Sequence, residues 1–515
     1  MEQKFICQRD YPVVQTKAGK VRGYQLDDTV IFKGIKYADA KRFQMPEETR
    51  PWEGTKEAFS YGYVSPLLEQ DKPTGELLVP HMYWPCSEDC QYLNVWTPSI
   101  RDQKKRPVMV WIHGGGFFAG SAIEQLCYEG TNMSKYGDVV VVSLNHRLNI
   151  LGFLDMSSVD ERYWNSANAG MADIVAALRW IRDNIAGFGG DPGNVPLFGQ
   201  SGGGAKIWHL MQIPEAEGLF HKAVIQSGVY DLHVDAADDD GKDLAEALLK
   251  ELKLDNKNTD KLEKLPYEEL LAAYKKVSPS FIKAGRYAGN MPHKNEYFLG
   301  DPREAGFTKW SRKIPVLIGT VMGEFSFGPV IENKKDLTRE EVEALLVKKY
   351  GEESLALIPE YEKAYPDKCL ADMLIVDTIF RKPTISFIEA RCKDPESETY
   401  SYQFTYEFPW DEGKIAWHCS ELPYVFHNAQ LVPICNNGAE TVKLQDTIFG
   451  VWMSFARTGA PVVEDVPWPK CEKGDEAMML LDLECRVRHN MDHVLVENLA
   501  KLVRPFDPEE ENIQH

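Results

Sequence analysis

The chain has 515 residues, a formal net charge of −20 and 43% hydrophobic residues. This hydrophobic share suits a large folded core, and the acidic balance argues against nucleic acid or an anionic membrane as a partner, because both bind basic patches. No apolar run approaches the ~18 residues of a membrane-spanning helix, and residues 1–10 lack the apolar stretch of a signal peptide. We therefore expect a globular, cytoplasmic protein.

Short strand-like pieces separated by turn residues fill the first hundred residues, for example 13–16 and 21–24, and predict a small antiparallel edge before the main sheet. Residues 172–185 carry apolar side chains at helical spacing and predict a helix that Gly187 ends. Apolar runs rich in β-branched residues predict strands at 108–112, 139–144, 196–198, 223–226, 316–320 and 400–404. This alternation predicts an α/β fold with a mostly parallel, doubly wound sheet, whose strand carboxyl ends gather ligands.

Two stretches, about 230–310 and 330–395, are more charged and more helical than the rest of the chain. We interpret them as helical insertions that cover the mouth of a site and shape a substrate pocket, so that residues 1–515 form a single domain. The acidic run 235–241 lacks the alternating ligands and the distal glutamate of a calcium loop and is interpreted as a solvated turn.

The ten cysteines are scattered, with no CxxC pair and no zinc-like cluster with histidine. This spacing favours free, mostly buried thiols in a reducing compartment over disulfides. Neither a metal nor an organic cofactor is predicted.

The most informative stretch is 198–204, Phe-Gly-Gln-Ser-Gly-Gly-Gly. It predicts a strand that enters a sharp turn with Ser201 at its apex, followed by a helix that begins at Gly202. Glycines flank the turn because a β-carbon there would collide with neighbouring backbone. Alone the pattern is weak, since a glycine-rich loop with an ordinary serine has the same letters.

A second glycine-rich stretch follows the predicted strand 108–112, where His113 precedes three consecutive glycines. Their backbone N–H groups, with that of Gly202, fit an oxyanion hole of three donors. A phosphate loop would require Lys and Ser or Thr at fixed offsets, which are absent; a merely flexible loop remains an alternative.

Serine nucleophiles need a base and an acid that orients it. His418 follows a strand and lies in a loop before an apolar segment, although a structural histidine is the commoner interpretation of its position alone. Glu324 follows a predicted strand and would lie at the same sheet edge as Ser201; a surface glutamate is the alternative. The order Ser, Glu, His along the chain matches the α/β-hydrolases.

Further motifs recur in a family order: Ser-Glu-Asp-Cys-Gln-Tyr-Leu-Asn-Val at 87–95, Asn-His-Arg-Leu at 145–148, and Gly-Gly-Asp-Pro-Gly-Asn-Val at 189–195. From about residue 13 to 503 the chain resembles the type-B carboxylesterase (carboxylesterase/cholinesterase-like) family of the α/β-hydrolase fold, in its bacterial form. The resemblance implies a serine carboxylesterase that hydrolyses small carboxylic esters through an acyl-enzyme. It implies Ser201 as nucleophile, His418 as base and Glu324 as its partner, with oxyanion donors at Gly115, Gly116 and Gly202.

Two departures from the family pattern bear on function. Ser65 stands where many secreted members have a cysteine that pairs with the one at Cys90, which fits an intracellular enzyme. Gln200 precedes the predicted nucleophile where much of the family has Glu, and a neutral amide weakens the case for a cationic substrate such as choline.

Four aromatic residues flank the predicted catalytic residues in sequence and are expected to form apolar pocket walls, with ordinary core positions as the alternative: Phe117, Phe118, Phe325 and Trp417. The same catalytic apparatus also serves an amidase, a thioesterase or a carbamate hydrolase. A non-catalytic cholinesterase-like interaction protein is the alternative from another class. The sequence leaves the natural substrate and the oligomeric state open.

Overall fold

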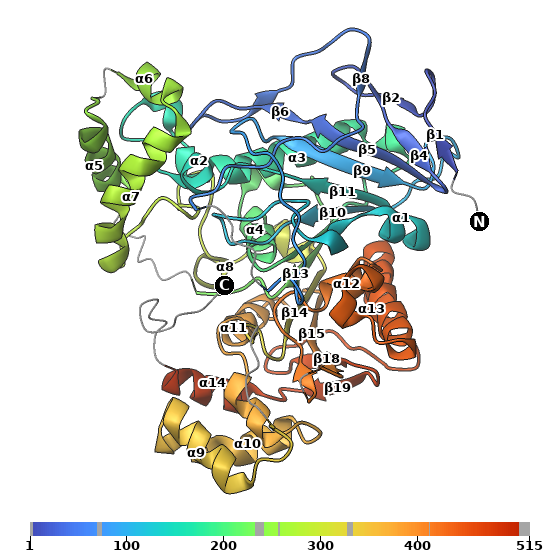
Figure 1. Cartoon of the computed structure of the whole chain (residues 1–515), viewed down its shortest axis with the longest axis vertical. Helices are drawn as coiled ribbons and strands as arrows, with labels where there is room; N and C mark the ends of the chain where they lie inside the picture. The colour runs from blue at the N-terminus through green and yellow to red at the C-terminus, as the bar shows by residue number, and fades with distance from the viewer. Residues whose placement is uncertain are drawn as a thin grey trace.

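The computed structural model describes residues 4–69, 75–231, 241–255, 258–326, 333–410 and 412–503. The predicted acidic turn therefore lies outside the described residues, apart from Gly241. Figure 1 shows a large twisted sheet through the middle of the molecule with helices packed around it.

In the described chain the main sheet has twelve strands. Their order is β1 (Phe5–Ile6), β4 (Tyr24–Leu26), β5 (Thr29–Lys36), β9 (Tyr92–Thr97), β11 (Val140–Leu144), β10 (Val108–Ile112), β12 (Pro196–Gln200), β13 (Lys222–Gln226), β14 (Val316–Val321), β15 (Thr399–Phe404), β18 (Ala477–Leu481) and β19 (Arg486–His489). Pairing is parallel from β11 through β18 and antiparallel at both edges. The predicted α/β-hydrolase fold with a mostly parallel sheet is confirmed.

The central strands are buried on both faces, which explains their continuous apolar runs. In β10, Val108 and Val110 point into one core, whereas Met109 and Trp111 point into the other. The first core lies under α3 (Ala169–Asn184), α4 (Gly202–Leu210) and α11 (Arg381–Arg391), and the second under α1 (Thr131–Gly137), α12 (Leu422–Val425) and α13 (Ala439–Thr458). The sheet is therefore doubly wound.

The predicted antiparallel edge is present in part. β2 (Val13–Gln15) pairs antiparallel with β3 (Lys20–Arg22) in a small sheet that includes β8 (Thr55–Glu57), whereas β4 joins the main sheet. Two more strand pairs lie apart from the main sheet: β6 (Ala38–Asp39) with β7 (Glu47–Glu48), and β16 (Glu407–Phe408) with β17 (Lys414–Ile415).

The remaining helices form two groups on the flanks of the molecule (Figure 1). One group contains α5 (Lys242–Leu252), α6 (Thr259–Lys264) and α7 (Tyr267–Lys283), and the other α9 (Arg339–Tyr350), α10 (Ile358–Ala364) and α14 (His493–Leu502); α2 (Asn149–Phe153) and α8 (Pro302–Ala305) are short. The two predicted insertions thus hold several helices. That they cap the active site stays a prediction.

Two further sequence features have a structural counterpart. The ten cysteines are free thiols, and the Cys90 thiol has the Ser65 hydroxyl as a hydrogen-bond partner. Among the residues described, none of the helices has both the length and the apolar character needed to cross a bilayer.

Candidate active site

Ser201 occupies a sharp turn between β12 and α4, with φ 55° and ψ −128°. This conformation is rare for a residue with a side chain. Close backbone contacts hold the turn: a β-carbon at Gly203 would overlap the Ile112 carbonyl, and the Ser201 N–H donates to the Gln226 carbonyl at 2.8 Å. The glycines of the motif therefore permit the turn that presents the serine at the carboxyl end of the sheet.

The glycine loop after β10 lies directly against this turn. A β-carbon at Gly202 would overlap the backbone N and O of Gly116, so the two segments touch. Gly115 and Gly116 have φ values of 78° and 59°, which favour glycine. Within the described chain, no protein acceptor is recorded for the N–H groups of Gly115 and Gly116, and that of Gly202 begins α4, where a helix has no internal acceptor. These three N–H groups are therefore available as donors, and their role as an oxyanion hole stays a prediction.

His418 and Glu324 are in direct contact, although 94 residues separate them. The His418 Nδ1 lies 2.5 Å from Glu324 Oε2, and the backbone N–H of His418 donates to the Glu324 carbonyl at 2.6 Å. The other carboxylate oxygen, Oε1, accepts from Ser227 Oγ at 2.6 Å and from the Val321 N–H at 3.0 Å. These contacts fix the carboxylate and hold the proton of the imidazole on Nδ1.

Other side chains contact the His418 ring, among them Phe380 and Gln200. The Phe380 ring stacks on it, with centroids 5.1 Å apart and planes 20° apart. The Gln200 Nε2 lies 3.2 Å from His418 Nδ1 and 3.1 Å from Nε2. A single carbon, Cε1, lies between these two nitrogens. In the plane of the ring, an atom at these distances from both nitrogens would collide with Cε1, so the Gln200 Nε2 lies over the ring face. The described residues show no hydrogen bond between Ser201 Oγ and His418. The contact between the two segments is made by the side chain of Gln200, the residue before Ser201.

Burial sets the protonation of this group. It lowers the pKa of His418 to about 4, against the opposing charges of Glu421 and Asp377. It raises the pKa of Glu324, and the hydrogen bonds that the carboxylate accepts from Ser227 and Val321 oppose this rise. The imidazole is therefore neutral near pH 7, as a general base requires.

Comparisons with known proteins decide the family. The model of the carboxylesterase family matches residues 10–497. The chain belongs to the carboxylesterase family. It is a carboxylic ester hydrolase of the α/β-hydrolase fold.

This carboxylesterase is similar to several characterised proteins. It is 32% identical to para-nitrobenzyl esterase of Bacillus subtilis (strain 168), over 93% of this chain and 96% of that protein. It is 30% identical to phenmedipham hydrolase of Pseudarthrobacter oxydans, over 95% and 99% of the two chains. A solved structure with TM-score 0.93 and 49% identity covers 98% of this chain and 100% of its own. That structure is of an esterase from anaerobic Clostridium hathewayi, described as able to hydrolyse aliphatic aromatic polyesters.

The four aromatic residues predicted as pocket walls separate into two pairs. Phe118 and Phe325 are 48% and 51% exposed, whereas Phe117 and Trp417 are 2% and 0% exposed. Phe117 packs edge-on against Phe153, and Trp417 belongs to the core behind His418. Phe117 and Trp417 thus occupy the core positions named as the alternative, whereas a pocket wall at Phe118 and Phe325 stays a prediction.

One polar cluster outside the predicted catalytic residues has the composition of a metal site. Glu476, Asp492 and His493 have the spacing of metal ligands, but the Arg381 guanidinium binds both carboxylates at 2.6–2.9 Å and takes the place of a cation.

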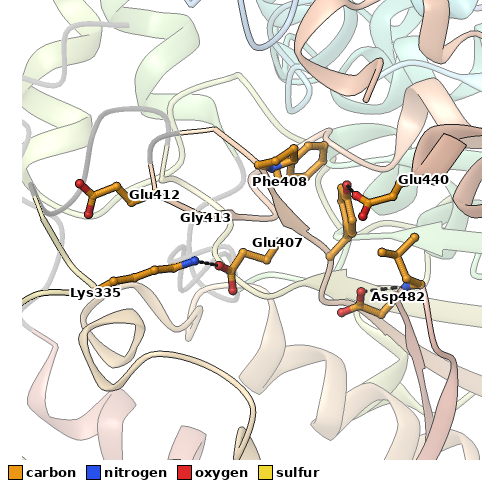
Figure 2. Close-up of a pocket in the computed structure, with 10 residues that line it drawn as sticks. Lys335, Glu407, Phe408, Glu412, Gly413, Glu440 and Asp482 are labelled. Atoms are coloured by element: carbon orange, nitrogen blue, oxygen red, sulfur yellow. Dashed lines mark hydrogen bonds and ion pairs between the residues drawn. The ribbon is translucent and has the colours of Figure 1, made fainter. Parts of the chain in front are cut away.

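A pocket of about 510 Å³ lies near β16 and β17, and Figure 2 shows the residues that line it. Four of the ten residues that line it are acidic, and one of these, Glu407, pairs with Lys335 at 2.9 Å. No residue of the predicted catalytic set lines this cavity.

Proposed function

We propose that the carboxylesterase hydrolyses small carboxylic esters in two acyl-transfer steps, with Ser201 as nucleophile, His418 as base and Glu324 as its partner. The observation that carries the proposal is the 2.5 Å contact between His418 Nδ1 and Glu324 Oε2 beside the turn that presents Ser201. An acid, a base and a nucleophile gathered at one sheet edge constitute the apparatus of acyl transfer.

In the first step, His418 Nε2 accepts the proton of the Ser201 hydroxyl as its oxygen attacks the ester carbonyl. The carbonyl oxygen becomes an oxyanion that accepts hydrogen bonds from the N–H groups of Gly115, Gly116 and Gly202. The alcohol then leaves with the proton from His418, and an acyl-serine remains. In the second step, water gives its proton to His418 and attacks the acyl carbon, and Ser201 recovers a proton as the acid leaves.

Glu324 has an electrostatic role in both steps. By accepting from Nδ1 it keeps the lone pair on Nε2, the nitrogen that must take the serine proton. Its carboxylate also stabilises the imidazolium that forms transiently inside a buried site. Catalytic hydrogen bonds are often long in free enzymes and tighten with substrate, which fits the absence of a serine–histidine bond among the described residues.

Covalent trapping tests the proposed nucleophile. We expect a fluorophosphonate to add one group per chain, and peptide mass spectrometry to locate it on Ser201. Modification of a different residue with parallel loss of esterase activity would contradict the assignment.

Amide, thioester or carbamate hydrolysis by the same residues remains the alternative within enzymes. A panel of matched oxygen esters, amides, thioesters and carbamates, ranked by kcat/KM, discriminates among them. We expect the esters to rank first. Family membership as a carboxylic ester hydrolase sets aside the non-catalytic interaction protein.

A second candidate substrate is an aliphatic aromatic polyester, as described for the similar Clostridium hathewayi esterase. The exposed rings of Phe118 and Phe325 favour it. The glycine loop after β10, residues 113–116, is called the oxyanion loop from here on. The Phe118 ring lies against Gly116 of this loop, and the Phe325 ring lies 5.1 Å from that of His418. Exposed rings beside Gly116 and beside His418 suit a chain that cannot enter a closed pocket.

We therefore expect Phe118→Ser with Phe325→Ser to slow polyester film hydrolysis more than hydrolysis of a small nitrophenyl ester. Phe5→Ser, which removes a 63% exposed ring at the far edge of the sheet, is the matched control. Equal loss on both substrates would refute a role in polymer binding.

We also propose a cytoplasmic location for the enzyme. Ten free thiols support it, since a reducing compartment keeps cysteines unpaired. Recovery of the activity in a membrane or extracellular fraction would contradict this location.

A further inference from the structure

Lys206 is a buried cation directly beneath the oxyanion loop. It lies on α4, five residues after Ser201, and its side chain has no exposed surface. Its Nζ donates to the His113 carbonyl at 3.1 Å and to the Gly114 carbonyl at 3.4 Å. Lysine is rarely buried so completely, because removing its charge from water costs free energy that hydrogen bonds or charge pairs must offset.

The bonded carbonyls belong to the peptide groups that lead into the oxyanion hole. In a trans peptide the C=O and the following N–H point in opposite directions, and the cis peptide recorded in the described residues is Tyr11–Pro12. A hydrogen bond that draws the Gly114 carbonyl inward therefore turns the Gly115 N–H outward, away from Lys206. Glycines on both sides would otherwise let this peptide group rotate easily.

The surroundings make Lys206 the positive charge at this position. Burial lowers the pKa of Lys206 to about 7, against the opposing charge of Glu124. Burial also lowers the pKa values of His113 and His146 well below the usual range, and that of His209 to about 3. These three histidines pack around the loop and stay neutral near pH 7, and His113 Nδ1 lies 3.0 Å from the Gly114 carbonyl.

We propose that Lys206 is a positioning residue for the oxyanion hole: its ammonium holds the carbonyls of His113 and Gly114 inward, so that the Gly115 N–H faces the reacting carbonyl oxygen. This inference rests on the ester-hydrolysis mechanism proposed above. When protonated, the ammonium also places a positive charge behind the peptide that bears the donor, where it favours a developing oxyanion.

Lys206→Met tests the proposal, because it keeps the length and apolar stem of the side chain and removes the donor and the charge. Losing one oxyanion donor outright costs about 10²–10³ in rate. A donor that is loosened rather than removed should lower kcat about tenfold to a hundredfold, with KM changed less than about twofold. The rate is expressed per site that reacts with a fluorophosphonate, so that unfolded protein does not contribute.

A trifluoromethyl ketone gives a readout that a purely structural role would not move. Ser201 adds reversibly to its carbonyl carbon and His418 takes the serine proton, which leaves an oxyanion in the same hole. The affinity for this ketone should fall by the same factor as kcat. An unchanged kcat per reactive site, or a change in KM alone, would overturn the proposal.

Lys222→Met is the matched control. Lys222 is 8% exposed, and its Nζ donates to Asn194 Oδ1 at 2.5 Å at the amino end of β13, the opposite end of the strands from Ser201. Its replacement should leave kcat per site unchanged. An equal loss of kcat in this control would show that the removal of any buried lysine lowers kcat, and it would overturn the specific role of Lys206.

Lys206→Gln covers the case in which the methionine variant does not fold. It keeps one donor without the charge, and its kcat and ketone affinity should lie between those of the wild type and of a complete loss. If neither variant folds, a crystal structure of the wild type with the ketone bound decides: the Gly115 N–H should donate to the ketone oxygen while Lys206 Nζ donates to the Gly114 carbonyl, and a Gly115 N–H turned away from that oxygen would overturn the proposal. Failure of the mechanism itself is distinct, because the wild type would then not be labelled at Ser201.

Discussion

Gln200→Glu should move the acid limb of the pH profile toward neutral pH. The Gln200 amide is 1% exposed and lies over the face of the His418 ring, 3.1–3.2 Å from both ring nitrogens. Glutamate has the same length, so the substitution places a carboxylate where a neutral amide now lies. That charge favours the imidazolium, and His418 must be unprotonated to act as a base.

The magnitude follows from the distance. Two opposite charges ~4 Å apart attract by about 4 kcal/mol at an effective dielectric constant of ~20, which corresponds to ~3 pKa units. The buried glutamate would also resist ionisation, so a shift of ~1–3 units is expected. The pKa of His418 is about 4 in the wild type. The limb of kcat/KM should therefore move from about pH 4 to about pH 5–7. The variant should then lose about half or more of its kcat/KM at pH 5 and stay close to the wild type at pH 8.

The assay is kcat/KM for a neutral nitrophenyl ester from about pH 3.5 to 9, with each enzyme stable over the range sampled. Gln200→Met is the control, since it removes the amide without adding charge and should leave the limb in place. A limb at the same pH in the Gln200→Glu enzyme would refute the contact with His418. A shift in the methionine variant would show that packing, not charge, sets the pKa.

Two further predictions concern buried charges. Glu324→Gln should lower kcat by up to about 10⁴ with little change in KM, because the amide favours the wrong imidazole tautomer; Asp377→Asn is the comparison, and a larger loss there would move the acid role to Asp377. Arg381→Met should destabilise the fold by roughly 3–5 kcal/mol in urea unfolding, since it leaves the carboxylates of Glu476 and Asp492 buried without their cation. Arg339→Met, at an exposed pair, should leave the urea midpoint nearly unchanged, because solvent screens such pairs; equal effects of the two substitutions would contradict this difference.

The central strands could be predicted from sequence because each is a buried apolar run in a parallel sheet. The expected strand at 108–112 coincides with β10, and the others agree within two residues. Strands at the sheet edges, such as β19, were missed because their side chains are only partly buried and carry no such signal.

The residues of the candidate site could be predicted from sequence, but the contacts between their side chains could not. The Ser201 turn follows from local glycines. The pairing of Glu324 with His418 came from the strand-end position of Glu324, the chain order and the family resemblance. A residue next to a catalytic residue in sequence can point its side chain toward the site or away from it. Phe117 and Trp417 point into the cores, which their sequence positions did not reveal. Phe380 packs on His418 from a distant helix start, a contact that no local pattern reveals.

Turnover by Ser201→Ala tests the central claim most directly. The variant removes a single hydroxyl from a turn held by backbone contacts, so the protein should fold as the wild type does by circular dichroism. We predict that its hydrolysis of a nitrophenyl ester falls to the small residual rate left by binding and the oxyanion donors alone. Turnover close to the wild-type rate in this folded variant would contradict the account.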